Sequence, residues 1–247
     1  MTAIVGVLCK DGAVIGTDSS ATFVQGQVRT IEQKTEKITV IGDHVIVAST
    51  GPIGLDQRFC AVVEKAWKDG IFIGLPVEVA KHLCRRALED FQFTGIQPGG
   101  YGALVAFPVD HRPHLVEFAV RDFQPEFKTA KLWYCSMGSG QQITDPFLGL
   151  MREVFWEHGP PSTQDALFAI TWTLQHVIDV NPGGVNSPIN VAVLERGKKD
   201  RLGARLLANE ELAQHQQNIV EAKAHLRSFR NKLQPGASPD VPDVPKP

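Results

Sequence analysis

The sequence predicts a layered α+β protein, and two antiparallel sheets packed together with helices on both outer faces would satisfy the order of its elements. Short β-branched runs, separated by Gly and Asp turn signals, indicate hairpins. Longer segments with helical periodicity follow in pairs between these hairpins. Paired helices between hairpins differ from the regular strand–helix alternation of a parallel sheet. Periodicity supports a layered α+β class and nothing finer.

The first fifty residues are predicted to form two β-hairpins. In each hairpin, two apolar strands flank a short turn that contains Gly and Asp. The polar segment Ser19–Glu36 between the hairpins is expected to be a loop. The four predicted strands are Ala3–Cys9, Ala13–Asp18, Lys37–Ile41 and His44–Ser49.

Five later segments are predicted to be helices. Pro76 suits the first turn of the second helix, and Ser162 with Asp165 forms a candidate capping box at the start of the fourth. The last helix is polar. It is expected either to present a solvated face or to contact a neighbouring subunit. The predicted helices are Leu55–Lys68, Pro76–Phe91, Asp145–Trp156, Thr163–Ile178 and Glu210–Leu233.

Further strands complete one predicted domain, residues 1–233. Residues 234–247 are rich in Pro and Asp and are expected to form a disordered C-terminal tail, because they offer nothing to build a core. The remaining predicted strands are Gly102–Val109, His114–Val120, Phe127–Cys135, Pro188–Arg196 and Ala204–Leu207.

Composition excludes several classes of function. The formal net charge is -2, and no block of Lys and Arg with interleaved aromatic residues indicates a nucleic-acid partner. The apolar runs are too short to span a membrane, and the N-terminus does not resemble a secretory signal. The four cysteines and eight histidines are too dispersed for a zinc motif, so we expect no metal or other cofactor. A cytoplasmic protein is expected.

Five motifs occur in an order that is typical of one family. They are Thr2–Thr22, Lys37-Ile-Thr-Val-Ile-Gly-Asp, Ser49-Thr-Gly51, Gly138-Ser139-Gly140, and Asp179–Gly184 followed by Ile189-Asn-Val-Ala-Val. Together they resemble the proteasome β-subunit family, as a bacterial relative of it, over Thr2 to Leu233. The resemblance implies the four-layer αββα sandwich of N-terminal nucleophile hydrolases and assembly into stacked rings.

The resemblance implies that Thr2 is the nucleophile once Met1 has been removed. The α-amino group of an N-terminal Thr can then take the proton from its own hydroxyl. Asp18 would hold a lysine ammonium that lowers the proton affinity of the Thr2 hydroxyl. Lys37 heads the expected strand and is preferred as this lysine. Counting without gaps selects Lys34 instead, so that alternative stays open.

The same resemblance implies the residues that support the reaction. The backbone N–H of Gly51 would stabilise the oxyanion, and a glycine there lets substrate approach closely. Ser139 and Asp179 match residues that support the nucleophile by hydrogen bonds. The sequence departs from the family at Pro182, where a serine usually helps to fix the terminal amine. Proline supplies neither a hydroxyl nor an N–H, so the efficiency of the reaction is in doubt.

The substrate cleft is implied in the same way. Ala21 and Thr22 would line its edge and pair with an extended peptide. Ser49 would form the base of the pocket for the residue before the scissile bond, with Ile53 and Ala21 on its walls. A small base, an apolar wall and no fixed carboxylate predict a preference for large apolar residues.

The predicted function is that of a self-compartmentalising threonine endopeptidase. Its expected partners are identical subunits in two stacked rings, unfolded protein or peptide substrates, and a separate ATP-dependent unfoldase. The resemblance implies twelve or fourteen subunits, and a tetradecamer is favoured. One alternative is a catalytically silent ring subunit that serves as a scaffold, as proteasome α-subunits do. Another is an N-terminal nucleophile amidohydrolase that acts on a small amide.

Overall fold

The computed structural model describes residues 2–25, 28–95, 99–181, 184–197 and 201–233, with residues 22–25 and 28–32 described by their backbone alone. Met1, Pro182 and the predicted tail at residues 234–247 therefore lie outside the described residues.

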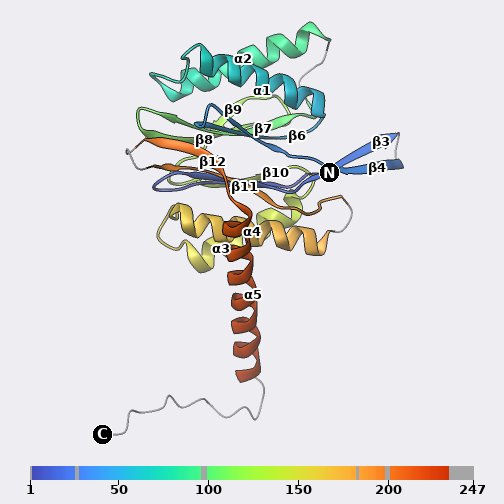
Figure 1. Cartoon of the computed structure of the whole chain (residues 1–247), viewed down its shortest axis with the longest axis vertical. Helices are drawn as coiled ribbons and strands as arrows, with labels where there is room; N and C mark the ends of the chain where they lie inside the picture. The colour runs from blue at the N-terminus through green and yellow to red at the C-terminus, as the bar shows by residue number, and fades with distance from the viewer. Residues whose placement is uncertain (1, 26–27, 96–98, 182–183, 198–200, 234–247) are drawn as a thin grey trace.

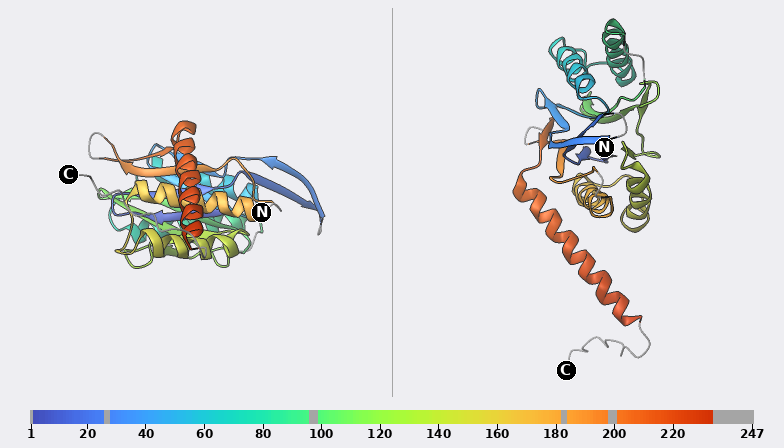
Figure 2. Two further views of the ribbon diagram at one scale, coloured as in Figure 1. Left: turned by 90° about the horizontal axis from the view of Figure 1, so that it is seen from below. Right: turned by 90° about the vertical axis from the view of Figure 1, so that its right-hand side faces the viewer.

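Two five-stranded antiparallel sheets lie face to face and form the two inner layers (Figure 1). Helices α1 and α2 cover the outer face of one sheet, and α3 and α4 cover the other (Figure 1). The expected four-layer αββα arrangement is confirmed. Helix α5 leaves the body beside α4 and extends away from it (Figures 1 and 2).

The elements have the following bounds. The first sheet has the order β10-β1-β2-β11-β12, made of Tyr134–Met137, Ile4–Leu8, Ala13–Thr17, Asn190–Arg196 and Leu202–Leu206. The second has the order β5-β6-β7-β8-β9, made of Ile38–Ile41, Val45–Thr50, Gly102–Val109, Arg112–Phe118 and Pro125–Phe127. Helices α1 to α5 are Ile53–Lys68, Pro76–Phe93, Gln141–Phe155, Thr163–Val180 and Asn209–Lys232.

The inner faces of the two sheets form a dry core. Ile4 and Ile15 from one sheet pack with Ile46 and Leu104 from the other, and all four side chains are fully buried. Gly6 lies on the same face, where a Cβ atom would stand 2.3 Å from Cδ2 of Leu104. The absence of a side chain at Gly6 therefore lets the two sheets approach closely at the strand that follows Thr2.

The α1–α2 layer is held by an aromatic cluster centred on Phe59. The Phe59 ring makes edge-on contacts with Tyr101, Phe118 and Phe123 at centroid distances of 6.2, 5.4 and 5.2 Å. The helical spacing of apolar residues in α1 brings this face onto the sheet, as the sequence predicts. The predicted capping box at the start of α4 is also present, with the Ser162 side chain accepting from the backbone N–H of Asp165.

The polar segment Ser19–Glu36 is more ordered than predicted. It contains a separate two-stranded hairpin, β3 (Ser20–Gln25) paired with β4 (Val28–Lys34), which projects beside the start of β1 (Figure 1). Several Thr, Val and Ile residues give both halves a β propensity that their polarity conceals. Each strand satisfies the other's backbone groups without joining a larger sheet.

The prediction of one strand over Phe127–Cys135 is wrong. Residues up to Phe127 belong to β9 in the second sheet, whereas Tyr134 begins β10 in the first sheet. Between them the chain turns, and the backbones of Thr129 and Leu132 bond reciprocally. A period of two indicates extended chain but cannot reveal that the chain passes from one sheet to the other. Helix α3 also starts earlier than predicted, at Gln141.

We expect Phe59→Ala to lower the free energy of unfolding by about 3–5 kcal/mol, because it removes a fully buried ring and leaves a cavity. Phe93→Ala is the matched control, since the Phe93 side chain at the end of α2 is 90% exposed. Urea unfolding at one protein concentration measures both changes. Equal losses for the two variants would contradict the central position of Phe59.

Candidate active site

Thr2 is fixed by the turn that precedes α3. Its backbone nitrogen donates to Oγ of Ser139 at 3.0 Å, and its carbonyl accepts from the backbone N–H of Gly140 at 3.0 Å. Gly138 in the same turn has φ +90, and a Cβ there would lie 2.3 Å from the Thr2 carbonyl oxygen. Glycine at position 138 therefore permits both the left-handed backbone and the close approach to Thr2.

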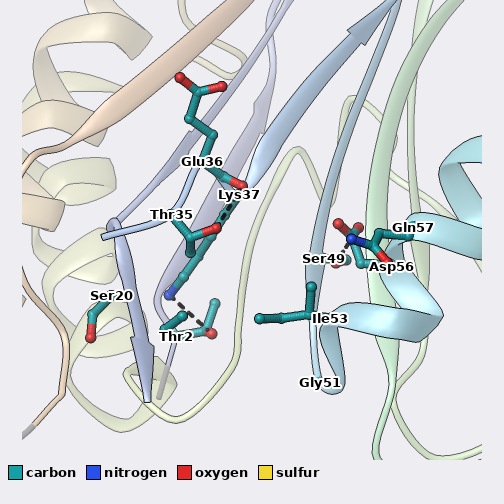
Figure 3. A pocket seen from close by; sticks show the side chains of 11 residues that line it. Thr2, Ser20, Thr35, Glu36, Lys37, Ser49, Gly51, Ile53, Asp56 and Gln57 are labelled. Atoms are coloured by element: carbon teal, nitrogen blue, oxygen red, sulfur yellow. Dashed lines mark hydrogen bonds between the residues drawn. The ribbon is translucent and has the colours of Figure 1, made fainter. Parts of the chain in front are cut away.

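Lys37 and Asp18 form a buried ion pair beside the Thr2 hydroxyl. Lys37 Nζ lies 2.8 Å from Asp18 Oδ1. It also donates to Thr2 Oγ1 at 3.2 Å (Figure 3). The two charged side chains are only 8% and 0% exposed. A buried charge is tolerated when it is paired and hydrogen-bonded, and this pair satisfies both conditions.

Backbone N–H groups hold the Asp18 carboxylate in place. Oδ1 accepts from Ala3 at 2.9 Å, and Oδ2 accepts from Ser20 at 2.9 Å and from Asn186 at 3.4 Å. These donors belong to three segments that are far apart in the sequence. The carboxylate consequently fixes the position of the Lys37 ammonium relative to the Thr2 hydroxyl.

The geometry separates the two candidate lysines. Lys37 stands directly before β5 and points into the cleft (Figure 3). Lys34 is the last residue of β4, where it pairs with Ser20, and its side chain is exposed. Of the two lysines, only Lys37 contacts Thr2 and Asp18.

A cleft of about 280 Å³ opens beside Thr2. Three predicted cleft residues, Ala21, Ser49 and Ile53, line it. The side chain of Thr22 lies outside the described residues. The lining also includes residues that the sequence did not single out: Ser20, Thr35, Glu36, Asp56 and Gln57.

Gly51 borders this cleft directly after β6. Its φ is +125, and a Cβ at this position would lie 2.3 Å from the backbone oxygen of Gly100. Any other residue would strain the backbone and collide with the neighbouring loop. Position 51 therefore needs glycine for a steric reason. This reason is separate from the oxyanion role that the sequence predicts for its backbone N–H.

The expectation of a pocket without a fixed carboxylate is wrong. Asp56 lines the cleft, and its Oδ1 accepts a hydrogen bond from Ser49 Oγ at 2.6 Å (Figure 3). Burial raises the pKa of Asp56, and the hydrogen bonds from Ser49 and Cys60 oppose this shift. The missed signal is helical spacing. Ile53 and Asp56 are three residues apart in α1 and therefore share the cleft-facing side.

Asp179 does not join the other predicted site residues. Its side chain is exposed near the end of α4, where it accepts from Gln175 at 2.7 Å and lies 3.6 Å from Lys223 Nζ of α5. The structure therefore brings together Thr2, Asp18, Lys37 and Ser139, and leaves Asp179 in a contact between two helices.

No group of three or more His, Cys, Asp or Glu side chains is arranged to hold a metal ion within the described part of the chain. The four cysteines are free thiols. None of the described helices is long and apolar enough to cross a membrane.

The architecture is that of an N-terminal nucleophile hydrolase. It is similar to a mutant of Anbu from Hyphomicrobium sp. strain MC1, with a TM-score of 0.69, 14% identity, and coverage of 96% of this chain and 100% of that chain. At this level of identity the likeness concerns the fold alone.

Comparison by sequence places the chain in a family. Residues 2–151 match the family model described as proteasome subunit, and the chain belongs to that family. It is similar to proteins named proteasome subunit alpha. The one from Thermococcus sibiricus is 33% identical over 121 residues, and the one from Pyrococcus abyssi is 34% identical over 121 residues. Each alignment covers 46% of this chain and 43% of the relative, so the chain spans less than half the length of these relatives.

We expect Lys37→Met to lower the free energy of unfolding, because it leaves the buried Asp18 carboxylate without its counter-charge. Removing one partner of a buried pair costs about 3–5 kcal/mol, and the backbone donors to Asp18 favour the lower end. Lys34→Met is the matched control and should change stability by less than about 0.5 kcal/mol. Urea unfolding compares them, and the reverse ranking would contradict this account of the pair.

Proposed function

We propose that this chain is a threonine endopeptidase subunit whose nucleophile is the Thr2 hydroxyl. One observation carries the proposal: the Lys37 ammonium lies within hydrogen-bond distance of both Thr2 Oγ1 and Asp18. A buried, oriented cation next to a hydroxyl lowers the proton affinity of that hydroxyl and favours its attack on a carbonyl carbon.

Removal of Met1 is essential to this proposal. While Met1 is attached, the Thr2 nitrogen is an amide and cannot accept a proton. Once it is free, the α-amine has an ordinary pKa of about 7.7–8.0 and can act as the base near neutral pH. The Ser139 hydroxyl, now 3.0 Å from this nitrogen, would then orient the amine.

The proposed reaction proceeds through an ester. Thr2 Oγ1 attacks the peptide carbonyl carbon while its proton passes to the α-amine, and the backbone N–H of Gly51 stabilises the oxyanion. The α-amine then protonates the leaving amine as the C–N bond breaks, which leaves the substrate acyl group on Oγ1. Water, deprotonated by the same amine, hydrolyses this ester and regenerates Thr2.

We further propose that the cleft accepts an extended peptide with a basic residue before the scissile bond. The residues at the β3 edge, Ala21 and Thr22, offer backbone groups for strand addition. The Asp56 carboxylate at the Ser49 side of the cleft, together with Glu36 at its rim, favours a Lys or Arg side chain. This replaces the preference for large apolar residues that the sequence suggests.

The proposed assembly is a tetradecamer of identical subunits in two stacked rings, in the cytoplasm. An exposed cleft with a free nucleophile would degrade proteins indiscriminately, so the rings would enclose the sites in a chamber. Unfolded proteins or peptides would be the substrates, and a separate ATP-dependent unfoldase would supply them.

A catalytically silent ring subunit is the second candidate function. The relatives reported above are named proteasome subunit alpha, which favours it. The Thr2, Lys37 and Asp18 arrangement favours catalysis, because a scaffold has no need for a buried cation beside the second residue of the chain.

Intact-mass measurement and peptide hydrolysis test the nucleophile. We expect the purified chain to begin at Thr2, Thr2→Ser to keep measurable activity, and Thr2→Ala to lose at least about 10³-fold in kcat. Thr35→Ala, which changes another threonine of the cleft, is the control and should stay active. Cleavage by protein that retains Met1 contradicts the mechanism. A chain that begins at Thr2, forms rings and cleaves nothing favours the scaffold.

The role of Asp56 predicts a pH-dependent preference. Because its pKa is raised, the carboxylate gains its charge only at higher pH, so the ratio of kcat/KM for Arg-containing over Leu-containing peptides should rise from about pH 5 to about pH 8. Asp56→Asn should reduce the ratio at pH 8 roughly tenfold, or ~1.4 kcal/mol. Glu64→Gln on the solvent side of α1 is the control. A ratio that Asp56→Asn leaves unchanged excludes this role.

A further inference from the structure

The C-terminal half of α5 extends beyond the body of the subunit. The first half packs against α4, with Leu212, Ile219 and Ala222 in contact with the helical core. Beyond Ala222 the helix continues away from both sheets (Figures 1 and 2). From Ala222 to Leu233 it is about 18 Å long at 1.5 Å per residue.

The apolar face that packs against the body continues along this extended half. Ile219, Ala222, Leu226, Phe229 and Leu233 follow one another at spacings of three and four residues, so they share one face of the helix. Ile219 is 2% exposed, whereas Leu226, Phe229 and Leu233 are 61%, 60% and 68% exposed. One continuous seam is therefore buried at one end and uncovered at the other.

The uncovered seam has a basic border. Arg227, Arg230 and Lys232 lie in this half of α5, and the sequence from Ala222 to Leu233 contains no Asp or Glu. Two such halves would repel each other if they paired, which disfavours contact between the α5 helices of two copies. The exposed face of α5 is instead complementary to an apolar strip that has acidic residues beside it.

Helix α3 presents such a strip. Leu150 and Val154 are four residues apart on its outer side, and their side chains are 48% and 60% exposed. Glu153 lies between them in the sequence, Glu157 follows the helix end, and both are exposed. The acidic residues beside this strip complement in charge the basic residues of the extended half of α5.

We propose that the extended half of α5 packs on α3 of a second copy of this chain. Leu226, Phe229 and Leu233 would cover Leu150 and Val154, and Arg230 would face Glu153. The two surfaces differ, so the contact is heterologous and repeats head to tail. Contacts of this type close rings. The inference concerns an interface that involves neither Thr2 nor the cleft.

Crosslinking of two differently tagged, co-expressed chains tests the identity of the partner. One chain carries Phe229→Cys and the other Val154→Cys. We expect oxidation to give a disulfide-linked band of twice the 27.1 kDa chain mass that contains both tags. Each variant expressed alone controls for the natural cysteines. Absence of the mixed band overturns the proposal.

Light scattering on size-separated full-length chains tests how much the α5–α3 contact contributes to assembly. Leu226→Asp with Phe229→Asp should shift the mass toward the single chain, and Ala224→Glu, on the opposite face of α5, should not. Arg230→Glu and Glu153→Arg should each raise the dissociation constant about fivefold, and their combination should restore it. A folded Leu226→Asp/Phe229→Asp chain with unchanged mass would show that this face of α5 does not hold copies of the chain together, and would overturn the proposal.

Thr2→Ala separates this interface from the proposed chemistry. The variant should assemble and crosslink like the original chain whether or not the chain is a peptidase. If substitutions in α5 abolish assembly while Thr2 is intact, the result concerns the interface alone. The proposed role of Thr2 is then still judged by the intact-mass and hydrolysis measurements.

Discussion

The buried ion pair between Lys37 and Asp18 is the constraint on which the site depends. Neither charge is stable in the interior alone, and the pair is retained because backbone donors from three segments complete the solvation of the carboxylate. The chain just before β1, the start of β3 and the segment before β11 must therefore meet at one point. The Thr2 hydroxyl lies at that point as a consequence of the same geometry.

Close packing of the layers allows these three segments to come together. Gly6 lets the two sheets come together behind Thr2, and Gly16 lies against Ile170 and Leu174 of α4, where a Cβ would meet their side chains at 2.5 and 2.7 Å. The cleft is lined by residues that lie next to β1, β3, β5 and β6 and at the start of α1. One side carries Thr2 and Lys37, and the other carries Ser49 and Asp56 (Figure 3).

Two parts of the surface differ in character, the cleft beside Thr2 and the exposed face of α5. The cleft is lined by polar side chains beside Thr2, whereas α5 leaves the body with an apolar seam that the described residues do not cover. Proteins rarely leave such a contiguous apolar strip in water. An exposed apolar strip on α5 is in keeping with membership of a family of subunits.

The sequence alone determined the layered α+β class, the positions of most strands and helices, and the roles proposed for Thr2, Asp18, Gly51 and Ser139. Local periodicity and turn chemistry carry the fold class and the elements, because each depends on neighbours within a few residues. The roles of these four residues are what the resemblance of the motifs to the proteasome β-subunit family implies. The tertiary structure placed Lys37, and not Lys34, in contact with Thr2 and Asp18, brought Asp56 into the cleft, and directed Asp179 toward Lys223 instead of Thr2. These outcomes depend on where loops and helices place side chains in space. Helical spacing can relate Asp56 to Ile53 on one side of α1, but long-range packing decides which elements that side meets.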